Sequence, residues 1–516
     1  MLAFIKNMFA SIILSFFLFF QISPTTAQQS PPRPTPTPSI AEFLNTLTAE
    51  TKHSIRVGGR QLNYTVTTGF MPLTNGQTGE TEAKIFYIAY TLDDENASVN
   101  KSNRPLMFSF NGGPGSASVW LHLGALGPKR VKMLDDGLMP PPPYQLVDNE
   151  QTWLTETDLV FIDPVGTGYS RAMKPELASK FFSVNGDIES IGEFIRLYLG
   201  RSERWSSPLF LIGESYGTAR AAGLSNHLFE RGIGLNGILL VSSVLNFQTI
   251  RFAEGNDVTY PLIFPSYTAT AWYHKRLPAN LQSKPLRQVL DEAENWAIKE
   301  YAPALVRSDR MSASEKQTLL EKFSSYSGLS RTFIEQNNYR INLDAFNKEL
   351  LRDQRRTTGR LDSRFTGIDR NAATDNPETD PSMNAIRPPY TATFNDYVRR
   401  DLGFRSDLEY YILGGGINAP WNFNVSQGYA NTAANLQSAM QKNPFMKIFV
   451  ASGFYDMATP YFATEYTLAA MNLDSTLRRN ISVSYYEAGH MMYIEKNSLR
   501  KLKEDASAFI QKSIQK

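Results

Sequence analysis

The most informative segment for the fold is Leu-Phe-Leu-Ile-Gly-Glu-Ser-Tyr-Gly at residues 209–217. Its first four residues form a short apolar run, and residues 218–231 after it have the pattern of a helix. The glycines at 213 and 217 permit a sharp turn between strand and helix, so Ser215 is expected to stand free at the strand end. The helix directs its positive end toward negative charge developing there. We therefore predict that Ser215 is a nucleophile.

Similar strand signals recur along the chain, at residues 105–110, 159–162, 237–241, 446–450 and 481–485. Most of these runs are apolar on both faces, which is typical of buried parallel strands. Helix-like segments lie between them, so the alternation predicts an α/β fold with a mostly parallel central sheet flanked by helices. Residues 55–67 and 82–92 are rich in β-forming residues and are expected to pair as an antiparallel ribbon.

The middle of the chain differs in character from its two flanks. Between residues 247 and 400 the apolar runs give way to amphipathic helical stretches, and residues 355–389 have a polar, loop-like composition. We expect a helical cap subdomain at 247–400, inserted between the two parts of one α/β domain at 41–246 and 401–516.

A serine nucleophile needs a base, and the chain has five histidines from which to choose. His490 directly follows a predicted strand, at a position where such sheets place their chemistry. The remaining four histidines fit less well. His53 lies near the N-terminus, His122 lies on a predicted helix, and His274 lies in the cap. His227 would be about 18 Å from Ser215 along a continuous helix. We predict that His490 is the base.

The acid that orients the base should lie between the serine and the histidine in the chain. Asp456 does so and comes directly after the predicted strand at 446–450, so it is the predicted acid. Asp163 also ends a strand, but it precedes the serine and is expected to cap a turn.

Asn-Gly-Gly-Pro-Gly at 111–115 ends another strand. Its backbone can aim the N–H group of Gly113, together with that of Tyr216, at the oxyanion that forms during the reaction.

Four motifs taken together resemble the serine carboxypeptidases. They are Asn-Gly-Gly-Pro-Gly-Ser at 111–116, Gly-Glu-Ser-Tyr-Gly at 213–217, Ser-Gly-x-x-Asp at 452–456 and Ala-Gly-His-Met at 488–491. The resemblance implies an α/β-hydrolase with a cap, which removes single residues from the C-termini of peptides. It also implies that Asn111 and Glu214 bind the terminal carboxylate of the substrate. A glutamate facing a carboxylate must share a proton with it, so binding should favour acidic pH.

The chain departs from the family pattern near these residues. Phe110 stands where a tryptophan is usual, and Ala125 stands where a second glutamate is common, so the carboxylate-binding network looks thinner. The residues after the nucleophile, 218–220, also differ from the usual pattern. An esterase or acyltransferase on the same scaffold is the first alternative, and a non-catalytic binding protein is the second.

The composition excludes several other classes of protein. The chain has 516 residues, 42% hydrophobic and 20% charged, with a net charge of +2 that indicates no nucleic-acid partner. The absence of cysteine excludes disulfides, zinc–thiolate sites and thiol nucleophiles. We expect no cofactor and no metal. The sequence leaves open the side-chain preference and the oligomeric state, with a homodimer among the alternatives.

The N-terminus has the pattern of a secretory signal peptide. Residues 1–27 combine Lys6, an apolar run at 8–22 and small residues before Gln28. An uncleaved anchor is the alternative, and no later stretch is apolar enough to cross a bilayer. A proline-rich linker follows at 28–40. We expect a periplasmic or secreted protein, and an exported chain without cysteine fits a bacterial source better than a eukaryotic one.

Overall fold

The computed structural model describes residues 48–93, 103–417 and 419–515 of the chain. The predicted signal peptide and linker lie outside these residues. None of the helices in the described ranges is both long and apolar enough to span a membrane.

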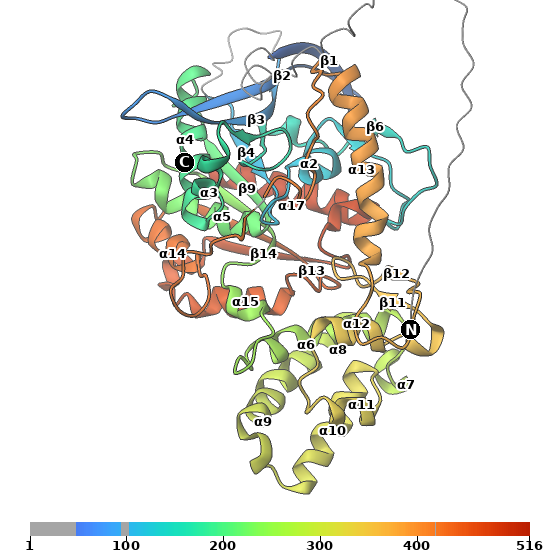
Figure 1. The fold of residues 1–516 in the computed structure, drawn as a ribbon. Helices are drawn as coiled ribbons and strands as arrows, with labels where there is room; N and C mark the ends of the chain where they lie inside the picture. Colours follow the sequence, from blue (N-terminus) through green and yellow to red (C-terminus); the bar gives the residue numbers. More distant parts are fainter. Residues whose placement is uncertain (1–47, 94–102, 418, 516) are drawn as a thin grey trace, which may run out of the picture. The chain divides into compact units, whose positions relative to one another are not determined.

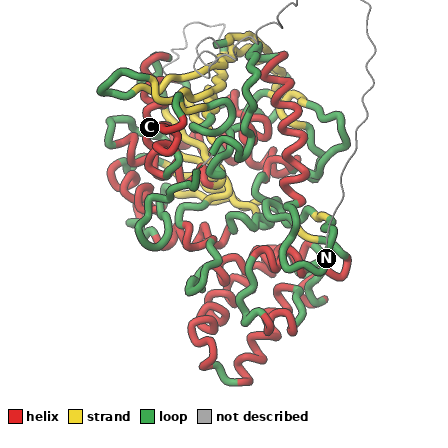
Figure 2. Tube along the Cα trace, in the orientation of Figure 1, coloured by secondary structure: helices red, strands yellow, loops and turns green. Residues whose placement is uncertain are grey.

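One large sheet forms the centre of this part of the chain (Figures 1 and 2). Its strands follow the order β1-β2-β3-β7-β4-β9-β10-β13-β14, and neighbours from β7 to β14 are all parallel. The parallel strands are β4 (Leu106–Phe110), β7 (Asp158–Ile162), β9 (Leu209–Ser215), β10 (Gly237–Ser243), β13 (Lys447–Gly453) and β14 (Ile481–Tyr486). All six predicted strands are therefore confirmed.

An antiparallel ribbon extends the sheet at one edge. It consists of β1 (Ala49–Val57), β2 (Arg60–Thr74) and β3 (Thr81–Leu92), with β8 (Arg171–Ala172) paired to β3. The expected pairing is confirmed, but the predicted strand at 55–67 is wrong as a single element. Gly58 and Gly59 have φ of +54° and +80° and turn the chain between β1 and β2.

Helices cover both faces of the sheet. Successive strand residues point to opposite sides, and apolar side chains on both sides are buried under helices. Phe108 and Leu211 pack on one face with α4 (Val184–Arg201), α5 (Tyr216–Phe229) and α14 (Ala433–Lys442). Met107 and Phe210 pack on the other face, with α17 (Lys496–Ile514) and α13 (Pro381–Arg400). Shorter elements against the sheet are α2 (Val119–Leu121), α3 (Pro175–Phe181), α15 (Tyr461–Ala470), α16 (Ser475–Arg478) and the ribbon of β5 (Lys129–Val131) with β6 (Leu146–Asp148).

A group of helices is inserted between the adjacent strands β10 and β13 and has a hydrophobic core of its own, centred on Phe264, Trp296 and Phe323 (Figure 1). These helices are α6 (Thr259–Tyr273), α7 (Ala279–Gln282), α8 (Leu286–Trp296), α9 (Ala302–Arg307), α10 (Ala313–Ser327), α11 (Arg331–Gln336) and α12 (Leu343–Glu349), followed by β11 (Thr357–Thr358) and β12 (Thr366–Gly367). The domain boundaries proposed above stay a prediction.

The loop predicted at 355–389 is wrong in its last part. Helix α13 begins at Pro381, because the Asp380 side chain accepts a hydrogen bond from Ser382 N and proline suits the first helical position. The helix continues through Pro388 and Pro389 and buries Ile386 and Tyr390 against the sheet core. Tertiary packing thus outweighs the unfavourable prolines.

Candidate active site

Ser215 ends strand β9 and directly precedes helix α5. Its backbone is strained, with φ of +60° and ψ of −130°. The turn is tight, since a Cβ on Gly213 would lie 2.1 Å from Gly217 O, and a Cβ on Gly217 would lie 2.8 Å from Phe110 O. Only glycine fits at both positions, and the resulting turn leaves the side chain of Ser215 half-buried at the sheet end.

Asp456 and His490 are in contact and buried. The Asp456 Oδ2 atom lies 2.7 Å from His490 Nδ1 and also accepts a hydrogen bond of 2.6 Å from Thr459 Oγ1. Its Oδ1 accepts from the backbone N–H groups of Ala458 and Thr459, which fixes the carboxylate. Burial lowers the pKa of His490, but Asp456 more than offsets this, so the pKa lies above its usual value.

Ser215 and His490 line one cavity of about 140 Å³, here called the inner cavity, together with Asn111, Glu214 and Arg360. Among the described residues, the Ser215 hydroxyl and the His490 imidazole do not form a hydrogen bond. Such contacts often tighten only when a substrate is bound. The structure thus brings the predicted nucleophile, base and acid to one place.

Glu214 is a buried carboxyl group next to the nucleophile. Burial raises its pKa to about 7, although the charge of His490 and hydrogen bonds from Tyr493 and Asn111 act in the opposite direction. The Tyr493 hydroxyl donates a hydrogen bond of 2.6 Å to Glu214 Oε2. Glu214 is therefore about half protonated near neutral pH.

Asn111 is held in a defined orientation by the backbone. Its Oδ1 atom accepts a hydrogen bond of 3.0 Å from Leu121 N, so its amide group remains as a donor toward Glu214. A donor amide and a protonated carboxyl in one small cavity suit a carboxylate ligand.

The glycine-rich loop packs directly against the turn at Ser215. A Cβ on Gly112 would lie 2.4 Å from Tyr216 N, and Gly113 has φ of +100°. Tyr216 is the first residue of α5, so its N–H group has no partner within the helix. Gly113, Ser215 and Tyr216 all line a second cavity of about 470 Å³, here called the outer cavity.

The other histidines and Asp163 lie elsewhere, and none of them lines either cavity. His122 is buried against the Tyr90 hydroxyl, and burial lowers its pKa to about 3. His227 contacts Arg231, while the remaining two histidines bind Thr51 and Ser363. Asp163 accepts a hydrogen bond from Ser118 N, and its expected role as a turn cap stays a prediction.

Two features near the site were not predicted from the sequence. Tyr493 follows His490 by three residues, but nothing in the local sequence connects it to Glu214. Arg220 was recognised only as a departure from the family pattern. It is buried, pairs with Asp187 at 2.8 Å and donates a hydrogen bond of 2.7 Å to Asn111 O.

The parallel sheet, the turn at Ser215 and the helices on both faces define an α/β-hydrolase fold. Its strand-to-helix turn and the Asp456–His490 pair lie at the carboxyl ends of the strands. The chain belongs to the serine carboxypeptidase family, whose profile matches residues 58–503.

Curated relatives include several proteins from Arabidopsis thaliana. Serine carboxypeptidase-like 1 is 28% identical over 225 residues, which cover 41% of this chain and 48% of the relative. Serine carboxypeptidase-like 7 is 32% identical over 158 residues, which cover 30% of this chain and 33% of the relative. The chain thus spans about half or less of the length of these relatives.

Solved structures to which the chain has a weak similarity include two from Saccharomyces cerevisiae. The peroxisomal alpha-beta-hydrolase Lpx1 has a TM-score of 0.34 and 11% identity, covering 87% of this chain and 89% of that chain. A soluble variant of monoglyceride lipase has a TM-score of 0.33 and 10% identity, and the match covers 92% of this chain and 97% of that chain.

Proposed function

We propose that this protein is a serine carboxypeptidase that hydrolyses the C-terminal peptide bond of peptides through an acyl-enzyme on Ser215. The observation that carries the proposal is the protonatable carboxyl of Glu214, buried in the cavity that Ser215 and His490 also line. A neutral ester carries no carboxylate that would call for such a group. A peptidase that binds a free terminal carboxylate needs a partner that can share a proton with it.

The proposed reaction begins with attack of Ser215 Oγ on the carbonyl carbon of the last peptide bond. His490 Nε2 accepts the hydroxyl proton, and Asp456 stabilises the resulting imidazolium. The N–H groups of Gly113 and Tyr216 stabilise the oxyanion. The proton then passes to the leaving amine, which departs as a free amino acid, and the acyl group stays on Ser215.

Water completes the cycle through the same groups. His490 accepts a proton from the water as it attacks the acyl carbonyl, and returns the proton to Ser215 Oγ as the shortened peptide leaves. During the first step Asn111 and protonated Glu214 hold the carboxylate of the residue to be released. Because this binding needs the proton of Glu214, we expect mildly acidic conditions to favour the reaction.

A ladder of peptides incubated with the wild type and with Ser215→Ala, followed by mass spectrometry, tests the proposal. Successive loss of single C-terminal residues with the wild type alone supports it. Turnover of simple esters without release of amino acids from N-blocked dipeptides would instead indicate the esterase or acyltransferase. Failure of a fluorophosphonate to label Ser215 would indicate the non-catalytic binding protein.

We also propose that the protein is exported to the periplasm or secreted, after cleavage of a signal peptide. The support is the pattern of residues 1–27. N-terminal sequencing of the exported protein should begin at Gln28. A mature protein that still starts at Met1 would favour the uncleaved anchor.

A further inference from the structure

The inner and outer cavities meet at Ser215. Gly113, Ser215 and Arg360 line both of them, whereas Asn111 and Glu214 line only the inner one. If the terminal carboxylate of a substrate binds Asn111 and Glu214, the residue to be released occupies the inner cavity. The scissile carbonyl then lies at Ser215, and the residue before it extends into the outer cavity.

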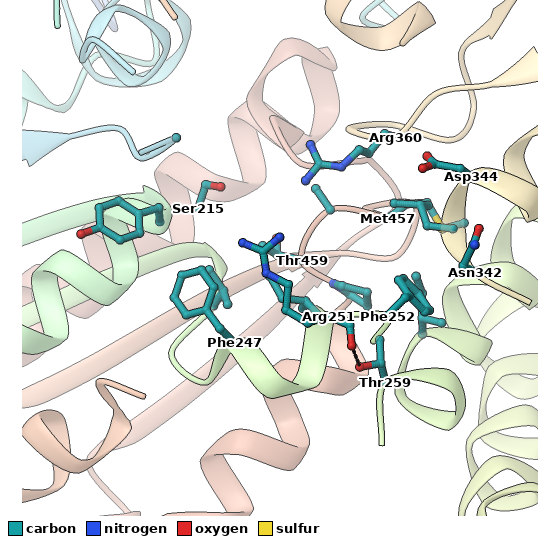
Figure 3. A pocket seen from close by; sticks show the side chains of 18 of the residues that line it. Ser215, Phe247, Arg251, Phe252, Thr259, Asn342, Asp344, Arg360, Met457 and Thr459 are labelled. Carbon is teal, nitrogen blue, oxygen red and sulfur yellow. Dashed lines mark hydrogen bonds between the residues drawn. The ribbon is translucent and has the colours of Figure 1, made fainter. Parts of the chain in front are cut away.

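Two arginines bring positive charge to the outer cavity. Figure 3 shows Arg251, which follows β10 in the chain, and Arg360, from the loop after β11, with their guanidinium groups directed into the space beside Ser215. Among the described residues, neither guanidinium lies within ion-pair distance of a carboxylate. Arg251 instead stacks over Phe247 and Phe423, with centroid distances of 6.0 and 5.8 Å.

Several other arginines of the inserted segment are neutralised by partners, whereas Arg310, Arg355 and Arg356, which have no ion-pair partner in the described part of the chain, line neither cavity. Arg276, Arg340 and Arg364 form ion pairs with Asp353, Asp257 and Asp362, respectively. An arginine side chain that lines a cavity without such a partner remains available to an anionic ligand.

One acidic residue also faces the outer cavity. Asp344, at the start of α12, lines it without pairing to either arginine, so the charged lining consists of two cations and one anion. The net positive charge disfavours a basic substrate side chain and favours an acidic one. Apolar residues such as Val244 and Ile263 complete the lining and suit the methylene groups of a glutamate.

We propose that the outer cavity selects peptides with an acidic residue immediately before the scissile bond, through Arg251 and Arg360. The proposal rests on the proposed function, because that function places the residue in this cavity. Guanidinium groups bind carboxylates with directed N–H donors, so they discriminate glutamate from glutamine of the same shape.

The test compares N-blocked dipeptides with glutamate, glutamine or lysine before a common C-terminal leucine. For the wild type we expect kcat/KM for the glutamate peptide to exceed that for the glutamine peptide by about fivefold to tenfold, the effect of ion pairs with two arginines that are exposed without a substrate. The ratio should fall close to unity in Arg251→Met/Arg360→Met and stay unchanged in the control Arg355→Met, whose side chain is exposed and lines neither cavity.

A wild-type ratio of one, or a ratio that persists in the double variant, overturns the inference. Preference for the lysine peptide also overturns it, and would assign selection to Asp344. Lack of turnover of every dipeptide counts against the proposed function instead. In that case calorimetric binding of the same peptides to Ser215→Ala still decides the inference, since equal Kd values for the glutamate and glutamine peptides refute it.

Discussion

Replacing Glu214 by glutamine keeps the shape of the side chain but removes its titratable proton, so it tests whether that proton is needed to bind the substrate carboxylate. Burial raises the pKa of Glu214 to about 7, so the wild-type carboxyl is about half protonated at pH 7 and about 1% protonated at pH 9. Only the protonated form can donate to a substrate carboxylate. We therefore expect wild-type kcat/KM on an N-blocked dipeptide to fall about fiftyfold between these two pH values.

The glutamine side chain donates hydrogen bonds at every pH, so Glu214→Gln should lose this alkaline fall. The substitution also removes the negative charge that raises the pKa of His490. The acid limb of the profile should therefore move to lower pH, because the imidazole stays neutral further into the acid range. Glu214 and His490 titrate as a coupled pair, so the apparent pKa values of the two limbs of the wild-type pH profile belong to the pair and not to either residue.

The assay is kcat/KM from pH 4 to pH 9.5, with the C-terminal amide of the same dipeptide as the matched control. The amide has no carboxylate, so its turnover should lack the alkaline fall even in the wild type. A fall with its midpoint near pH 7 that survives in Glu214→Gln, or that the amide also shows, refutes the assigned role. A flat wild-type profile would refute it as well.

Three further substitutions test the surrounding structure. Tyr493→Phe removes a donor that stabilises ionised Glu214, so the alkaline limb should move to higher pH in the same assay. Asp456→Asn should lower kcat by about 10⁴-fold while circular dichroism stays unchanged, because the imidazole loses the carboxylate that orients it. Asp187→Asn leaves buried Arg220 unpaired and should lower the free energy of unfolding by about 3–5 kcal/mol in urea titrations. An unchanged unfolding midpoint would contradict this reading of the ion pair.

The parallel strands and the turn at Ser215 could be predicted because their signals are local. A strand buried on both faces is a continuous apolar run, and a tight strand-to-helix turn requires glycine at fixed offsets from the serine. Both patterns lie within about ten residues of chain. The positions of Ser215, Asp456 and His490 at the ends of such strands followed from the same patterns.

Features that depend on contacts between distant residues could not be predicted in this way. The predicted loop includes the first part of helix α13, up to Pro389, because prolines and polar residues there disfavour a helix. Burial of residues such as Ile386 and Tyr390 in the core stabilises the helix. Tyr493 and Glu214 are 279 residues apart, so no local pattern connects them.

The order of the parallel strands along the chain and the residues that end them can be read from the sequence, because burial and tight turns restrict residue type locally. Which side chains face Glu214, and which arginines line the outer cavity without a partner, depends on the three-dimensional fold. The physical reason is that pKa values and ligand preference depend on burial and on the spatial arrangement of charges. Packing of segments far apart in the chain creates that arrangement, as it does where Arg251 and Arg360 line the same cavity as Ser215 (Figure 3).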